Sequence, residues 1–546
     1  MMLGWRHTMN VARFLRLGLS ASLVGLLAST AACTSDSGAD GSAGDEDDLT
    51  SINARSRTLE FVGTVYVEAN ASAPAILAAV RSQSQTAFGP MRTSEIAVNS
   101  RELKEVDEKT FVKRTVKVID PSVVNDPGKD MLEVKYTYRD NAVVGLKYAR
   151  KTTASLAVMS PNYRNQLERI LKECTPGDEH AREFLSTAWY VFEPSLSSCQ
   201  DAMKAEQAKI DADRLLLKEK TTQVTKSDVE RLYLPIQAKL GADKTNRGAS
   251  YPEYAKLYAG GVQPNKLVIS LVFGNIDHVA SGGPSGDFNW GELMTTLEEV
   301  METGGELKPV TVAGQPAVDL AQFKLKSGKT VDKPSFKDLV GLHSGKTGLQ
   351  IPPADKSDLE KQFSERIFKK WIGVERTVSV KNGAEAAHDV GVQFLVYFGV
   401  ESEGTPHHFA TKNSDVFLYN GHSQIGFGPL DPRNFSASDF SDGYQLLWID
   451  GCVSYNYYEK DYIPLKKGGT KNLDLITNAV ESPSFRSGHA MGQWLNVLLN
   501  GKGASYKDLL LAARDTDGPT DSLRVVDGEI DNDFTPAKFP MTITPR

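Results

Sequence analysis

The chain has 546 residues, of which 40% are hydrophobic and 24% are charged, so a packed core is expected and global disorder is excluded. Its length corresponds to roughly two to four domains. The formal net charge is −7, and residues 1–32 contribute three arginines and no acid, so the remainder carries −10. A chain this acidic lacks the basic face of a dedicated nucleic-acid binder.

The first 32 residues have the three parts of a secretory signal peptide. Three arginines precede an apolar run, Leu17–Leu27, and small residues then lead to Cys33. Thr30-Ala31-Ala32-Cys33 resembles a bacterial lipobox, although that motif prefers leucine where Thr30 stands. The resemblance implies a lipid on Cys33 and a membrane-anchored lipoprotein, periplasmic or at the cell surface. Cleavage after Ala32 with release of a soluble protein is the alternative.

The next segment, residues 33–56, is predicted to be a solvated tether. Residues 34–48 are almost entirely Ser, Gly, Ala and Asp and end in four consecutive acids, a composition that cannot bury apolar surface.

Two regions follow before the main domain, and each has its own pattern. Residues 57–155 show the alternation of apolar and polar residues that is typical of strands, and they contain one helix-like segment. This pattern predicts an α+β accessory domain. Residues 156–261 carry mostly helical spacing, which predicts a helical region. The expected strands are 58–68, 110–119 and 131–139, and the expected helices are 74–88, 162–174 and 200–220.

The four cysteines divide into three roles. Export would place them in an oxidising compartment, where Cys174 and Cys199 are the natural disulfide pair. Closing that loop is worth about 3 kcal/mol in the chain-entropy model. With Cys33 lipidated, Cys452 remains as a free thiol, either a reactive group or a buried inert one.

Residues 262–546 read as an α/β domain. Short apolar runs separated by helices predict a mainly parallel sheet with helices on both faces. Ligands on such sheets bind at the carboxyl ends of the strands. The expected strands are 266–275, 391–400, 415–420, 444–450 and 473–479, and a helix is expected over 290–302, closed by Gly304-Gly305.

Two of these strands end in chemically active residues. One runs into Gly421-His422-Ser423 and the other into Gly451-Cys452. If the strands are adjacent and parallel, a thiol nucleophile and an imidazole acid/base meet at one edge. The glycines allow sharp turns, and the N–H groups of Ser423 and Cys452 are placed to hold an oxyanion.

These two blocks, VFLYNGHS and LLWIDGCVS, resemble the caspase-like cysteine peptidases, the group of gingipains, clostripain and legumain. The resemblance implies an endopeptidase acting on protein or peptide substrates. Cys452 would attack the peptide carbonyl and His422 would protonate the leaving amine. The family has glycine where this chain has Ser423, whose side chain would crowd the cleft.

Two other functions remain open. A serine esterase would use Ser423, because Gly421–Ile425 approximates the G-x-S-x-G elbow of α/β-hydrolases. Asp442 or Asp450 and His489 follow in the required order, but Ile425 replaces the last glycine. The other alternative is a non-catalytic surface lipoprotein that keeps the fold as a binding scaffold.

No cofactor or metal is expected. Clustered carboxylates near the C-terminus are of the type that binds Ca²⁺, but their spacing is not that of an EF-hand, so we expect solvated loop side chains. These are Asp515, Asp517, Asp521, Asp527, Glu529, Asp531 and Asp533. A tyrosine cluster follows Cys452 and either lines a cleft or packs under the sheet edge, namely Tyr455, Tyr457, Tyr458 and Tyr462.

Overall fold

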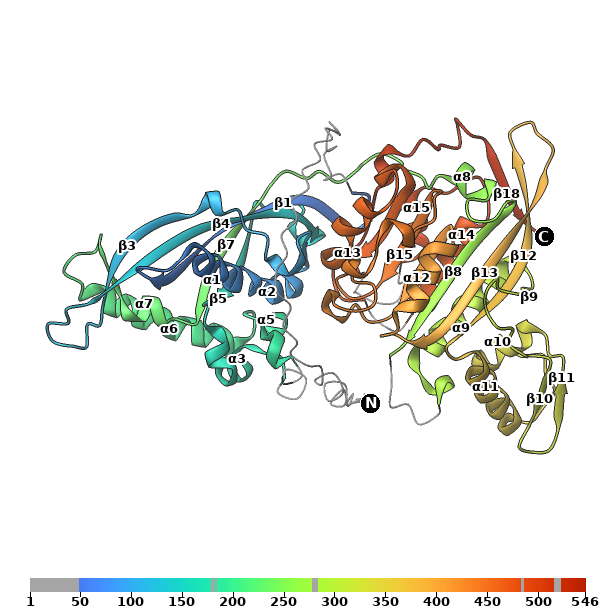
Figure 1. Ribbon diagram of the computed structural model, residues 1–546, viewed down its shortest axis with the longest axis horizontal. Helices are drawn as coiled ribbons and strands as arrows, with labels where there is room; N and C mark the ends of the chain where they lie inside the picture. The colour runs from blue at the N-terminus through green and yellow to red at the C-terminus, as the bar shows by residue number, and fades with distance from the viewer. Residues whose placement is uncertain (1–48, 178–181, 183, 277–282, 483–485, 515–521) are drawn as a thin grey trace, which may run out of the picture.

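The computed structural model describes residues 49–546 except 178–181, 183, 277–282, 483–485 and 515–521. The expected signal peptide, most of the tether and Cys33 therefore lie outside the described residues. Two lobes stand side by side, each built around its own large sheet (Figure 1). The fold is α/β, as expected.

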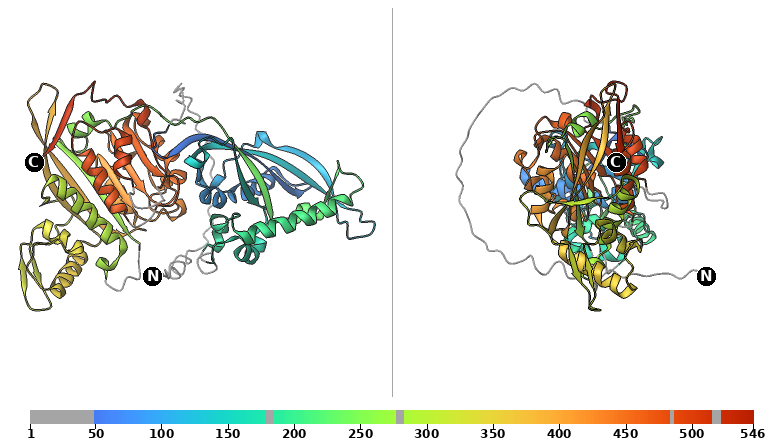
Figure 2. Two further views of the ribbon diagram at one scale, coloured as in Figure 1. Left: turned by 180° about the vertical axis from the view of Figure 1, so that it is seen from behind. Right: turned by 90° about the vertical axis from the view of Figure 1, so that its right-hand side faces the viewer.

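The N-terminal lobe is a seven-stranded sheet with its helices gathered on one side (Figure 2). Strands β1 and β4 pair antiparallel along their whole length, from Ala54 opposite Gly145 to Glu68 opposite Met131. Alternate residues of β1 point inward, so a helical layer covers that face. The strands are β1 (Ala54–Glu68), β2 (Ile96–Val98), β3 (Val112–Ile119), β4 (Lys129–Gly145), β5 (Thr153–Met159), β6 (Gln223–Thr225) and β7 (Tyr233–Leu240), and the helices are α1 (Ala73–Gln85), α2 (Phe88–Thr93), α3 (Leu167–Cys174), α5 (Ala188–Val191), α6 (Ser197–Leu215) and α7 (Lys226–Glu230).

The expected boundary at residue 155 is wrong, because it falls inside β5. Strands β5 and β7 both belong to the sheet that begins with β1, in the order β5-β7-β1-β4-β3-β6. The two expected regions are therefore one folded lobe. The Cys174–Cys199 disulfide is present and joins α3 to α6, which confirms the predicted pair.

The C-terminal lobe is a nine-stranded sheet with five parallel strands at its centre. The order is β17-β16-β15-β14-β8-β13-β12-β18, and β17, β12, β18 and β9 pair antiparallel at the two sides. The strands of this lobe are β8 (Lys266–Asn275), β9 (Lys308–Val310), β10 (Gln322–Lys324), β11 (Thr330–Asp332), β12 (Lys370–Asn382), β13 (His388–Val400), β14 (Val416–Asn420), β15 (Gln445–Asp450), β16 (Leu473–Asn478), β17 (Arg524–Asp527) and β18 (Met541–Pro545), and the helices are α8 (Tyr254–Ala259), α9 (Phe288–Gly304), α10 (Phe336–Ser344), α11 (Pro353–Ile367), α12 (Gly404–Asn413), α13 (Ser454–Tyr462), α14 (Ser487–Leu498) and α15 (Tyr506–Ala512).

Helices cover both faces of this sheet, which explains why its central strands are continuously apolar. Alternate residues of each strand enter two different cores. Leu418 and Trp448 face α9 and α14, whereas Phe417 and Ile449 face α13. The core on the α13 side continues without a break into the N-terminal lobe.

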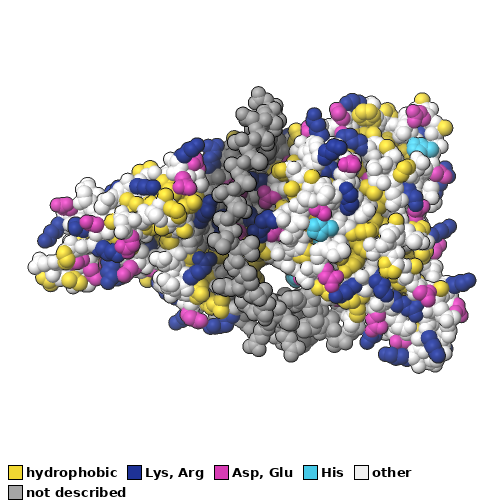
Figure 3. Space-filling view, in the orientation of Figure 1, with side chains coloured by type: hydrophobic (Ala, Val, Ile, Leu, Met, Phe, Trp, Pro, Cys, Tyr) yellow, Lys and Arg dark blue, Asp and Glu magenta, His cyan; other side chains and the backbone are white. Residues whose placement is uncertain are grey.

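The chain passes between the lobes twice. Thr50 pairs with Val526 of the C-terminal lobe, and Ser51 Oγ donates to the Arg524 carbonyl, before β1 starts the N-terminal lobe. The chain returns through residues 241–250 after β7. Residues 49–56 are thus part of the fold, which corrects the expected end of the tether. Acidic and basic side chains are intermixed over both lobes on the face in Figure 3.

Candidate functional site

The two strands that carry the predicted site are neighbours. Strands β14 and β15 are parallel, and their register places Asn420 opposite Asp450. Gly421 and Gly451 follow at matching positions, and a Cβ on Gly451 would lie 3.3 Å from the Gly421 carbonyl oxygen. The prediction that His422 and Cys452 leave one edge of the sheet is confirmed for the backbone.

Close approach restricts the two turn glycines to different degrees. A Cβ on Gly421 would collide with the Tyr419 hydroxyl, which would have to move, whereas one on Gly451 would lie 3.4 Å from the Ser423 nitrogen and Cβ, a tight but ordinary contact. Ser423 itself is buried, so its side chain occupies the space between the two turns, as the departure from the family pattern implies.

The Cys452 thiol is free, partly buried and not activated. Its Sγ lies 3.8 Å from the Ser482 carbonyl, to which it donates. Burial raises the pKa of the thiol to about 11, Glu481 and Asp450 also raise it, and Arg92 lowers it. The thiol is therefore protonated at neutral pH in this conformation.

His422 has an exposed side chain, and its backbone is fixed on both sides. Its N–H donates to Glu401 Oε2 at 3.1 Å, and its carbonyl accepts from the Tyr419 hydroxyl at 2.9 Å. Within the described residues, no hydrogen bond joins the His422 ring to the Cys452 thiol. The structure brings the two residues to one edge without forming the expected dyad contact.

The expected oxyanion donors are available. In the described part of the chain, neither the Ser423 N–H nor the Cys452 N–H donates to a protein acceptor. The Tyr458 hydroxyl donates to the Ser423 carbonyl at 2.9 Å and so helps to fix this turn. Two N–H groups at the ends of adjacent strands suit a developing oxyanion.

A row of polar side chains at the strand ends was missed in the sequence. Asp450 accepts from Asn478 Nδ2 at 2.6 Å and from Ser482 Oγ at 2.9 Å, and Asn420 Nδ2 lies 3.4 Å away. Arg524 lies 3.7 Å from the same carboxylate. Each of β14, β15 and β16 ends in Asn or Asp after an apolar run, which was the available signal.

The esterase arrangement is not assembled. Asp450 is held by the partners above, and Asp442 lies before β15, at the opposite edge from Cys452. His489 pairs through Nδ1 with Glu299 at 2.7 Å. No acid–histidine pair is therefore directed at Ser423 among the described residues.

The tyrosines after Cys452 are buried and pack, rather than lining a cleft. Tyr457 stacks on Phe88 of the N-terminal lobe, with ring centroids 6.0 Å apart. Two further N-terminal side chains lie near the thiol. Arg92 influences the pKa of Cys452, and Cys452 in turn raises the pKa of Tyr190, although burial is the larger cause there. Nothing in the sequence indicated these contacts.

The candidate Ca²⁺ carboxylates that the structure describes do not gather into a site. Among the described residues, no group of three or more His, Cys, Asp and Glu is placed to hold a metal ion. Asp515, Asp517 and Asp521 lie outside the described residues. Asp531 accepts from Thr470 and Asp533 pairs with Lys538, whereas Glu529 is 1% exposed, which corrects the expectation that it is solvated.

Comparison of the chain with family models, with curated proteins and with solved structures found no match. In the described part of the chain, no helix has the length and apolar character needed to cross a membrane.

Proposed function

We propose that this protein is an exported cysteine endopeptidase that uses Cys452 and His422. The observation that carries the proposal is the register of β14 and β15, which brings Gly421-His422 and Gly451-Cys452 to matching positions at one sheet edge. The signal-peptide pattern and the lipobox-like Cys33 support a membrane-anchored lipoprotein outside the cytoplasm. The substrate would be a protein or peptide.

The chemistry follows the thiol–imidazole scheme. His422 would take the proton from Sγ of Cys452, and the thiolate would form a C–S bond to the scissile carbonyl carbon. The N–H groups of Ser423 and Cys452 would stabilise the oxyanion. His422 would then protonate the leaving amine as the C–N bond breaks, and water would hydrolyse the thioester to free Cys452.

The described conformation is a resting state in this proposal. The thiol is protonated, and the imidazole must rotate toward it before a proton can pass. The exposed position of the His422 side chain leaves room for that rotation.

The test is hydrolysis of a quenched-fluorescence peptide library by the secreted form that starts at Thr34. Hydrolysis is expected to disappear in Cys452→Ala and to fall by about a hundredfold or more in His422→Ala. The control is His388→Ala, because His388 is also exposed but begins β13 and so lies at the opposite sheet edge. Fluorophosphonate labelling at Ser423 would instead favour the esterase. No hydrolysis in any form, including the variants described below, would favour the scaffold.

A further inference from the structure

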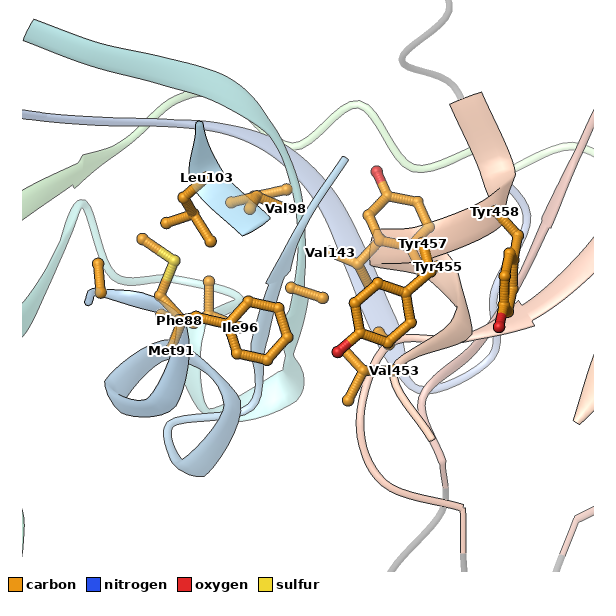
Figure 4. Packing of buried hydrophobic residues seen from close by; sticks show 14 of the residues in the cluster. Phe88, Met91, Ile96, Val98, Leu103, Val143, Val453, Tyr455, Tyr457 and Tyr458 are labelled. Atoms are coloured by element: carbon orange, nitrogen blue, oxygen red, sulfur yellow. The ribbon is translucent and has the colours of Figure 1, made fainter. Parts of the chain in front are cut away.

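The N-terminal lobe packs directly on the helix that follows Cys452. Phe88 of α2 stacks on Tyr457 of α13, and Ile96, Val98 and Leu103 face Val453 and Tyr457 across the boundary (Figure 4). Asn456 Nδ2 is buried and donates to the Val98 carbonyl at 2.8 Å and the Ser100 carbonyl at 3.0 Å. The boundary is therefore a buried apolar contact with the Asn456 amide nitrogen hydrogen-bonded at its centre.

Ion pairs ring this core, and each one ends on a segment that borders the candidate site. Arg101 pairs with Asp431 at 2.7 Å, in the loop that follows His422, and its guanidinium lies over the Phe427 ring. Lys460 of α13 pairs with Glu105. Arg92 pairs with Glu481, next to the residue whose carbonyl accepts from the thiol.

The same N-terminal residues lie beside the thiol, which is partly buried. Arg92 is almost buried, with a side-chain exposure of 12%, and stacks over Tyr190 with its Cζ 4.8 Å from the ring centroid. Cys452 is packed against the core that both lobes share. A substrate chain must approach this thiol from outside, so the lobe occupies part of the space that substrate would need.

We infer that the N-terminal lobe is an intramolecular inhibitor of the proposed peptidase, and that the Arg92–Glu481 pair is the latch that holds it over Cys452. This inference rests on the proposed function, whose site it regulates. In this arrangement the lobe partly covers the nucleophile until the boundary opens.

Arg92→Gln tests the latch, because the electrostatic effect and the opening of the latch would change the alkylation rate of Cys452 in opposite directions. Electrostatics alone predicts slower alkylation of Cys452, since Arg92 is a cation that lowers the pKa of the thiol. Opening of the latch predicts faster alkylation, because the thiol becomes accessible. We expect iodoacetamide labelling of Cys452 at pH 8, followed by mass spectrometry, to become about tenfold faster.

The control is Lys147→Gln, which breaks a more exposed ion pair within the N-terminal lobe. Lys147 and Glu95 are 3.1 Å apart and both about half exposed, at 43% and 46%. Cys452 in Lys147→Gln should be labelled at the same rate as Cys452 in the wild type. Unchanged or slower labelling of Arg92→Gln would overturn the inference, and slower labelling would mean that the lobe completes the site.

A second variant acts at the centre of the boundary. Asn456→Asp is isosteric but places a carboxylate oxygen against the carbonyls of Val98 and Ser100. It should also accelerate labelling, while circular dichroism and the urea unfolding midpoint report that both lobes remain folded. If this variant is folded and labels no faster than the wild type, the inference fails.

The two proposals fail separately. Faster labelling of both variants without peptide hydrolysis would support the inhibitory contact around the thiol and refute the peptidase proposal. Peptide hydrolysis by the wild type at full rate, with no faster labelling of either variant, would support the peptidase proposal and refute the inhibitor.

Discussion

The rate at which Cys452 of the wild-type protein is alkylated should show the raised pKa of this partly buried thiol. Its pKa of about 11 compares with an ordinary 9.0, so the thiolate fraction at pH 7 falls about a hundredfold. A more basic thiolate is intrinsically more nucleophilic, which recovers roughly sixfold. Ionisation alone therefore predicts labelling about 15 times slower than that of an exposed cysteine, and enclosure slows it further.

The assay is iodoacetamide labelling of the secreted form between pH 6 and 11, with the modified peptide quantified by mass spectrometry. The rate should rise about tenfold per pH unit until close to pH 11. The same chain in urea, with the disulfide intact, supplies the exposed reference for Cys452. A plateau beginning near pH 6 or 7 in the folded protein would refute the reasoning, because it would mean a thiolate already stabilised by a neighbouring cation.

Two stability measurements test other parts of the fold. Burial raises the pKa of Asp474 to about 7, although Tyr444 and Tyr506 donate to it and oppose the rise. Its contribution to stability is therefore complete below about pH 4, the unfolded pKa, and is lost as the pH rises through 7. In Asp474→Asn the urea midpoint should fall less between pH 5 and pH 8 than in the wild type, and an equal fall in both proteins would contradict the assignment. Replacing Cys174 and Cys199 by serine should cost about 3 kcal/mol of N-terminal lobe stability in urea unfolding, whereas an unchanged midpoint would show that α3 and α6 are held by packing alone.

Much of the C-terminal sheet could be predicted because its central strands are buried on both faces. Continuous apolar runs mark β8 and β13–β16, and the expected 266–275 equals the observed β8. The expected helix over 290–302 lies within α9, which ends at Gly304 and is capped by Gly305 with φ of 83°. Strand β12 was missed because polar and charged residues interrupt its apolar ones, as suits an antiparallel strand nearer the sheet margin.

The N-terminal lobe was harder to divide because its pairings are long-range. Strand β7 joins β1 and β5 after a stretch that is mostly helical, and local spacing does not record which strand a segment will pair with. The hydrophobic periodicity therefore predicted two regions, 57–155 and 156–261, although both contribute strands to one sheet.

For the candidate site, the sequence predicted where His422 and Cys452 lie but not the protonation state of the Cys452 thiol. Glycine followed by His or Cys at a strand end is a local pattern, and it placed His422 and Cys452 at one edge. The pKa of the thiol depends on burial and on Arg92, which is 360 residues away in the chain. No local pattern contains that information.

The two crossings between the lobes make the N-terminal lobe an insertion within the C-terminal one. Thr50 and Ser51 are held to β17 by hydrogen bonds, so the lobe is joined to the C-terminal lobe covalently through residues 241–250 and non-covalently at its other end. A single proteolytic cut within 241–250 would leave the lobe held only by non-covalent contacts, among them the pairing of Thr50 with Val526. Departure of the lobe would then require no second cut, only the loss of these contacts. Any pull on the chain before residue 49 would be borne by the edge of the C-terminal sheet.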